Sequence, residues 1–294
     1  TKLLNIDRDL LMIPNVAIHM NRAANDGFKY NLQVDMLPLL SAGDDRQKDF
    51  KQIIADELGV KKEDILGHDL YLYNRMAPSI WGANEEFISA GHLDDLQCGF
   101  ASLKALLGGY NDDSIDIMAC FDNEEVGSGT KQGADSTLLR DTLTRINSAL
   151  GKTEEDYHRA LASSFMLSAD NAHAVHPNHP EHTDATNCTY MNEGVVVKSH
   201  AGQKYTSDGV SMAVVKALAS GADVPLQYFA NRSDKAGGST LGNIAMAQAS
   251  MNAVDIGLPQ LAMHSSYETA GIKDTYYAIT LMQALFDSHI QETS

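Results

Sequence analysis

The chain has 294 residues, of which 44% are hydrophobic and 21% are charged, and its formal net charge is −17. This length and composition are typical of a globular protein with a sizeable core, and no apolar run reaches the roughly 18 residues of a membrane span. The negative charge disfavours nucleic acids and anionic membranes as partners, because both require a basic surface. The three cysteines, Cys98, Cys120 and Cys188, form no CxxC pair. They are predicted to be reduced thiols of a cytoplasmic protein.

The first part of the chain, residues 1–86, is predicted to be a smaller, β-rich domain. β-like pieces lie around Pro14 and Pro38, and residues 70–73 have the pattern of a further strand. The stretch from residue 75 to residue 86 is aperiodic and contains proline and glycine, so it is predicted to hold the domain boundary.

An amphipathic helix is expected inside this first part. Asp44 or Asp45 can cap its start, and Gly59 can end it. Phe50, Ile53, Ile54 and Leu58 recur at helical spacing and therefore share a face.

The second part, residues 87–294, alternates strands with helices. Strands are predicted at 115–121, 165–168, 194–198, 226–229 and 253–256, and helices from about residue 95 to 108 and at 136–150, 207–220, 239–251 and 275–287. This alternation indicates an α/β fold with a mostly parallel central sheet flanked by helices. Ligands of such sheets bind at the carboxyl ends of the strands.

Four acidic or histidine sites directly follow apolar runs in this second part. They contain Asp94, the pair Glu124 and Glu125, Asp170, and His264. Asp, Glu and His are ligands that suit zinc. Taken singly, each has an ordinary explanation: a helix cap, a solvated glutamate pair, a turn residue and a core imidazole. Their joint order at predicted strand ends favours a metal site.

The adjacent glutamates are the most informative of these residues. Glu124 and Glu125 repel each other unless a cation lies nearby. One carboxylate can ligate a metal ion while the other accepts a proton from a metal-bound water, whose pKa the ion lowers to about 7. A separate histidine-rich stretch, residues 173–182, could instead be a metal tract of its own, although it explains none of the carboxylates.

The order of the motifs resembles the aspartyl aminopeptidases, a family of di-zinc exopeptidases. The resemblance covers nearly the whole chain. It rests on IPNVAIH at residues 13–19, LDD at 93–95, DNEEVGS at 122–128, SADNAHAVHP at 168–177 and PQLAMHS at 259–265.

The resemblance implies a specific set of metal ligands. Asp94 would bridge two zinc ions, Glu125 and His264 would complete one site, and Asp170 would bind the other ion. Glu124 would be the general base. Each complete subunit would hold two zinc ions, for which cobalt or manganese could substitute.

The resemblance also implies a substrate and an assembly. The substrates would be peptides with an N-terminal Asp or Glu, contacted by His173, Lys198 and Tyr205. His19, in the inserted dimerisation domain, would reach the active site of a partner subunit. Dimers would assemble into a dodecamer. Lys198 is a candidate partner for the acidic substrate side chain, with a surface lysine as the alternative.

One feature of the family has no counterpart in these residues. The family supplies a further zinc-binding histidine from a segment upstream of the dimerisation domain, and we expect this chain to be part of a longer protein that contains it. Two alternatives remain open. One is a di-zinc exopeptidase or deacylase that prefers neutral residues, and the other is a catalytically degenerate scaffold.

Overall fold

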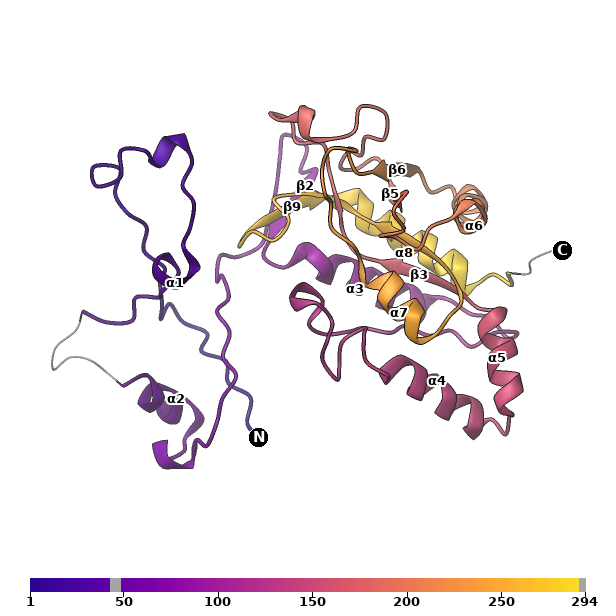
Figure 1. Cartoon of the computed structure of the whole chain (residues 1–294), viewed down its shortest axis with the longest axis horizontal. Helices are drawn as coiled ribbons and strands as arrows, with labels where there is room; N and C mark the ends of the chain where they lie inside the picture. The colour runs from indigo at the N-terminus through magenta and orange to yellow at the C-terminus, as the bar shows by residue number, and fades with distance from the viewer. Residues whose placement is uncertain (43–48, 291–294) are drawn as a thin grey trace. The chain divides into compact units, whose positions relative to one another are not determined.

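A computed structural model describes residues 1–42 and 49–290 of the chain. The chain divides into two compact units, Thr1–Arg75 and Met76–Ser294 (Figure 1). The predicted boundary at residue 86 lies a short distance inside the second unit, because residues 79–81 pair with a strand of that unit. The role of the first unit in dimerisation stays a prediction.

The first unit is mostly irregular in its described residues. Its helical elements are η1 (Ala24–Asp26), α1 (Leu32–Asp35), α2 (Phe50–Leu58) and η3 (Lys62–Asp64). Within residues 1–42 and 49–75 the pairing of β type is one isolated bridge between Met12 and Leu39, so the expectation of a β-rich unit is not met there. Residues 70–73, predicted as a strand, have no regular structure. Among the described residues no strand lies beside their side chains to pair with them, as β structure requires.

Helix α2 forms as its sequence pattern predicts. Ile53 and Ile54 are buried on one face, and Gly59 ends the helix in the left-handed region at φ 61°. Asp49 caps the start by accepting a hydrogen bond from the backbone N–H of Lys51. The predicted caps, Asp44 and Asp45, lie outside the described residues.

The second unit is built on a four-stranded sheet with the order β3 (Phe165–Ala169), β7 (Asn252–Gly257), β5 (Val195–Ser199) and β6 (Leu226–Ala230). β3 runs parallel to β7 and β5 parallel to β6, whereas β5 and β7 are antiparallel. The predicted α/β class is confirmed. The sheet is mixed because its two parallel pairs meet along an antiparallel junction.

Helices cover both faces of this sheet (Figure 1). Val195, Val197, Val254 and Ile256 point to one face, where they pack against α3 (Leu93–Gly108), α6 (Gly209–Gly221) and α8 (Ile272–Phe286). α7 (Leu241–Gln248) lies on the other face, beside the side chain of Asp255. It packs with α4 (Leu138–Ala149) and α5 (Glu154–Ala162) around a second cluster.

A second sheet closes one end of this unit. Its order is β1 (Ser79–Trp81), β2 (Phe87–Ala90), β9 (Glu268–Gly271), β8 (Pro259–Leu261) and β4 (Ala172–His173). The pairs are antiparallel except for β8 with β4. These strands have two to four residues each, so their alternation is too brief to mark them in the sequence.

One predicted strand of the second part does not form. Residues 115–121 are irregular, and Ile115 and Ile117 are exposed. No described strand pairs with this segment. No helix among the described residues is long and apolar enough to cross a membrane.

Candidate metal centre

Three predicted ligands meet at one point although they come from three separate segments. Asp94 lies at the start of α3, Glu125 lies in the short helix η4 (Glu124–Val126), and His264 lies between β8 and β9. The His264 Nε2 atom is 3.1 Å from Asp94 Oδ2 and 3.0 Å from Glu125 Oε1. The three side chains therefore offer two carboxylate oxygens and one imidazole nitrogen to a common centre.

Asp170 belongs to a second group that shares Asp94. Asp170 directly follows β3, at the carboxyl end of a sheet strand, as the sequence predicts. Ligand atoms of Asp94, Asp95 and Asp170 lie within 4.8 Å of one another. Asp94 is thus common to two adjacent groups of oxygen and nitrogen atoms, and Asp95 joins the second group although the sequence does not single it out as a ligand.

The electrostatics of this cluster are unfavourable without a cation. Asp94 Oδ1 and Asp95 Oδ1 are buried and accept no hydrogen bond. Burial, followed by the charges of Asp170, Asp95 and Glu125, raises the pKa of Asp94 to about 9. Burial and Asp170 also raise the pKa of Asp95. Buried carboxylates that lack donors are stabilised by a metal ion, so the donor set fits zinc.

Glu268 holds two of the ligand segments together from behind the centre. This side chain is 2% exposed. Its carboxylate accepts a hydrogen bond from the backbone N–H of Asp94 at 2.9 Å and another from that of His264 at 2.7 Å. The sequence does not single out Glu268, because a lone glutamate beside an apolar strand carries no signal of this role.

Glu124 lies in the same helical turn as Glu125. Asn123, with φ 60°, precedes the turn, and Gly127, with φ 99°, ends it, so the glutamate pair sits in a tight loop. Partial burial raises the pKa of Glu124, and the negative charges of Asp170 and Glu125 raise it further. A carboxylate of raised pKa beside a metal centre is suited to accept and return a proton.

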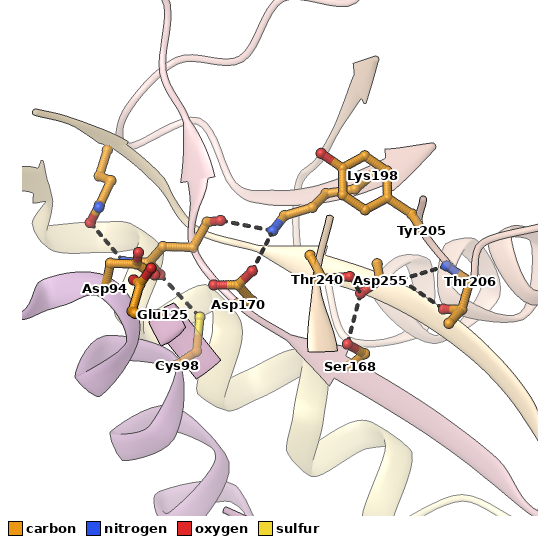
Figure 2. Close-up of polar contacts among 12 residues, drawn as sticks. Asp94, Cys98, Glu125, Ser168, Asp170, Lys198, Tyr205, Thr206, Thr240 and Asp255 are labelled. Atoms are coloured by element: carbon orange, nitrogen blue, oxygen red, sulfur yellow. Dashed lines mark hydrogen bonds and ion pairs between the residues drawn. The ribbon is translucent and has the colours of Figure 1, made fainter. Parts of the chain in front are cut away.

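Lys198 is buried beside the centre and has partners of its own. Its Nζ atom is 3.4 Å from Asp170 Oδ2 and donates a hydrogen bond to the backbone oxygen of Asn171 at 2.7 Å (Figure 2). Only glycine fits at Gly257 without displacing its neighbours, because a Cβ there would lie 2.1 Å from the backbone oxygen of Asp170 and 2.9 Å from Lys198 Cε. Lys198 is 3% exposed, so the alternative of a surface lysine is wrong, and its ammonium group neutralises part of the acidic cluster.

The other predicted substrate residues have different positions. Tyr205 is buried, and Lys198 Nζ lies 5.7 Å from the centre of its ring. His173 lies in β4 with its ring centroid 6.2 Å from that of Phe229, and desolvation, followed by the positive charges of Lys198 and His264, lowers its pKa. His19 is exposed in a turn of the first unit, and its role stays a prediction.

Asn171 connects the elements that carry the ligands. Its amide nitrogen donates to the backbone oxygen of Leu93 at 3.0 Å and to Gln260 Oε1 at 2.8 Å, and its side-chain oxygen accepts from Cys98 Sγ at 3.0 Å. These contacts join α3, β8 and the segment that contains Asp170. The amide is 2% exposed, so it acts as a fixed internal spacer.

A family model described as aminopeptidase I zinc metalloprotease (M18) matches residues 1–286. The chain belongs to the M18 family. The predicted kinship with the aspartyl aminopeptidases, which are M18 proteins, is thereby confirmed.

Other M18 proteins resemble the chain along nearly all of its length. It is 49% identical over 280 residues to a Clostridium acetobutylicum protein named "Probable M18 family aminopeptidase 2", covering 94% of this chain and 65% of the relative. A Clostridium novyi protein of the same name is 47% identical over 290 residues, covering 98% and 67%. The chain thus spans about two thirds of the length of these M18 relatives.

Solved M18 structures share the fold. In a cryo-EM structure of an Ape4 and Nbr1 complex, one chain matches with a TM-score of 0.86 and 34% identity, over 96% of this chain and 58% of that one. A structure of the S. cerevisiae mApe1 dodecamer matches with a TM-score of 0.73 and 27% identity, over 87% and 61%.

Proposed function

We propose that this chain carries most of the catalytic centre of a zinc-dependent aminopeptidase that removes N-terminal Asp or Glu residues from peptides. The observation that carries the proposal is the meeting of Asp94, Glu125 and His264 within hydrogen-bonding distance, beside Asp170. Membership of a family of zinc metalloproteases supports the choice of reaction and of metal.

Each residue has a distinct part in the proposed reaction. Asp94, Glu125 and His264 would hold one ion, and Asp94 and Asp170 would hold a second. Zinc, when bound, polarises the scissile carbonyl and makes a water molecule acidic enough to lose a proton near neutral pH. Glu124 accepts that proton and returns it to the leaving amine.

The chain also provides candidates for binding the substrate. Tyr205, or His19 from a partner subunit, donates a hydrogen bond to the oxygen that becomes negative. Lys198 attracts an acidic side chain. Lys198 has three N–H donors and uses one for Asp170 at 3.4 Å and one for Asn171 at 2.7 Å. A substrate carboxylate would therefore take the remaining donor and share the ammonium group with Asp170.

Glu124→Gln tests the proposed base in the intact gene product. The amide keeps the shape of the side chain but cannot accept the proton, so hydrolysis of an aspartyl chromogenic substrate should fall by about a hundredfold or more. Zinc content should stay at the level of the unchanged protein. Glu155→Gln, on the exposed face of α5, is the matched control. Near-native turnover by Glu124→Gln would exclude its role as the base.

Lys198→Met tests the preference for acidic substrates. Rates on aspartyl, glutamyl and leucyl substrates of the same leaving group should converge, because the cation that attracts the acidic side chain is gone. Unchanged ratios would assign the specificity to other residues. A native protein that prefers leucyl substrates would favour the alternative of a neutral-residue exopeptidase or deacylase. A protein without bound zinc would favour the scaffold alternative.

We also infer a cytoplasmic location and an assembly of dimers into a dodecamer. The likeness to the S. cerevisiae mApe1 dodecamer supports the assembly, and the three free cysteines support the location. Light scattering of the intact gene product measures the assembly directly, and a monomer at working concentration would rule the proposal out.

A further inference from the structure

A group of metal-ligating side chains lies on the loop between β4 and β5, apart from the candidate metal centre. Ligand atoms of His179, Glu181 and His182 lie within 4.8 Å of one another. All three residues are exposed. None of them belongs to the ligand groups around Asp94.

The short helix η5 (Pro180–His182) brings these side chains together. In a 3-10 helix the side chains at positions i and i+3 lie above one another. His179 and His182 have this spacing, and their rings stack with centroids 5.6 Å apart and an angle of 23°. Glu181 lies beside them, with its Oε1 atom 3.0 Å from His179 Nδ1.

Backbone hydrogen bonds within the chain fix the shape of this loop. The backbone N–H of His179 donates to the oxygen of His176 at 3.0 Å, and that of His182 donates to the oxygen of His179 at 3.2 Å. Arg232 donates to the backbone oxygen of Glu181 and pairs with Asp234, so its charge is held by other partners. Binding of an ion therefore costs little additional ordering of the backbone.

The donor set selects a class of ion. Two imidazoles and one carboxylate suit zinc and its neighbours nickel and copper, whereas calcium and magnesium prefer oxygen ligands. Zinc–ligand bonds of about 2.0–2.1 Å place tetrahedral ligands about 3.3 Å apart. The contact of 3.0 Å between His179 and Glu181 is close to this spacing. The ligand atom of His182 lies within 4.8 Å of the other two, and the ring is exposed, so it has room to rotate toward a common ion.

We propose that His179, Glu181 and His182 form a second binding site for a divalent ion of the zinc class, on the surface of the β4–β5 loop. Three protein ligands leave one coordination position for water or another donor. A cavity of about 460 Å³, lined in part by Thr183, Asp184 and Arg232, opens in the segments that flank this site. The site does not depend on the proposed peptidase activity, because it shares no residue with the candidate metal centre.

Zinc titration by calorimetry, on metal-stripped intact protein, tests the proposal. The variant His179→Ala/His182→Ala should lose a binding step that the unchanged protein and His158→Ala retain. His158 is the matched control, an exposed histidine of α5. The variant Asp94→Asn/His264→Ala should lose binding at the candidate metal centre and keep the loop step. Glu181→Gln, which keeps the shape of the loop, should weaken that step.

Footprinting with diethyl pyrocarbonate locates the ion by residue. Added zinc should protect His179 and His182 from modification, while His158 and His68, also exposed, should react at the same rate with and without zinc. The proposal is overturned if His179→Ala/His182→Ala binds zinc with the same steps as the unchanged protein. It is also overturned if zinc leaves the modification of His179 and His182 unaltered.

Discussion

Glu268 provides the sharpest test of how the fold positions the candidate metal ligands. Its carboxylate accepts the backbone N–H groups of Asp94 and His264, at 2.9 Å and 2.7 Å, in a place where the side chain is 2% exposed. In Glu268→Gln, one of these N–H groups would face an amide NH₂ and lose its acceptor. A hydrogen bond to a charged group contributes about 1.5–3 kcal/mol, and a stranded buried donor costs about 1–3 kcal/mol.

We therefore expect Glu268→Gln to lower the free energy of unfolding of the metal-free protein by about 2–4 kcal/mol. Removal of an outer partner of metal ligands typically weakens metal binding about 10–100-fold, so zinc affinity should fall by a similar factor. Urea unfolding followed by circular dichroism gives the first quantity. Competition with a zinc chelator, on protein shown to be folded, gives the second.

Glu155→Gln is the control for Glu268→Gln, because it makes the same chemical change on an exposed helix face. Its stability should change by less than about 0.5 kcal/mol. The reasoning would be refuted if Glu268→Gln matched this control in both stability and zinc affinity. The carboxylate would then have no part in holding the two segments.

Three further changes test other parts of the second unit. Burial raises the pKa of Asp274 to about 7, above its unfolded value, so the buried carboxyl is protonated at pH 5 and its ionisation opposes folding as the pH rises. Between pH 5 and pH 7 the unchanged protein should lose about 2 kcal/mol of unfolding free energy relative to Asp274→Asn. Urea titration at each pH measures this difference. Parallel profiles of unfolding free energy against pH for the two proteins would contradict the prediction. Asp255 is 0% exposed and each of its side-chain oxygens accepts two hydrogen bonds. Asp255→Asn should therefore lower the free energy of unfolding, measured with urea, by about 3 kcal/mol. A loss below about 0.5 kcal/mol would show that these hydrogen bonds do not stabilise the fold. Asn171→Ala removes the spacer between ligand segments and should cost about 2–3 kcal/mol and weaken zinc binding in the chelator assay; unchanged affinity would show that the ligands hold their places without it.

The sequence predicts the main helices and the four central strands because their apolar residues recur with clear periods. Val195 to Val197 and Val254 are the simplest cases, since both lie in buried strands of the four-stranded sheet. Residues 115–121 have the same apolar character, yet no described strand lies beside them. A sequence pattern gives the intrinsic preference of a segment for β structure, whereas a strand forms only where a neighbouring strand is available to pair with it.

The convergence of Asp94, Glu125, Asp170 and His264 could be predicted because each follows an apolar run and the family resemblance orders them. The residues that hold these four side chains in place could not be predicted. Glu268 accepts hydrogen bonds from backbone N–H groups. Nearly every residue type carries such a group, so the sequence does not reveal the partners of this carboxylate. Lys198 is recognisable as a buried cation only once its strand is known to pass Asp170.

The hydrogen bond between Asp94 and Glu268 spans 174 residues of chain, which sets the order of events during synthesis. A ribosome must release the polypeptide well beyond Glu268 before the two segments can meet. Zinc capture at the proposed centre would therefore be a late event, because long-range contacts form only after the intervening chain has closed. Fragments that stop short of β9 should therefore be unable to retain zinc, because they lack the carboxylate that holds Asp94 and His264 in place.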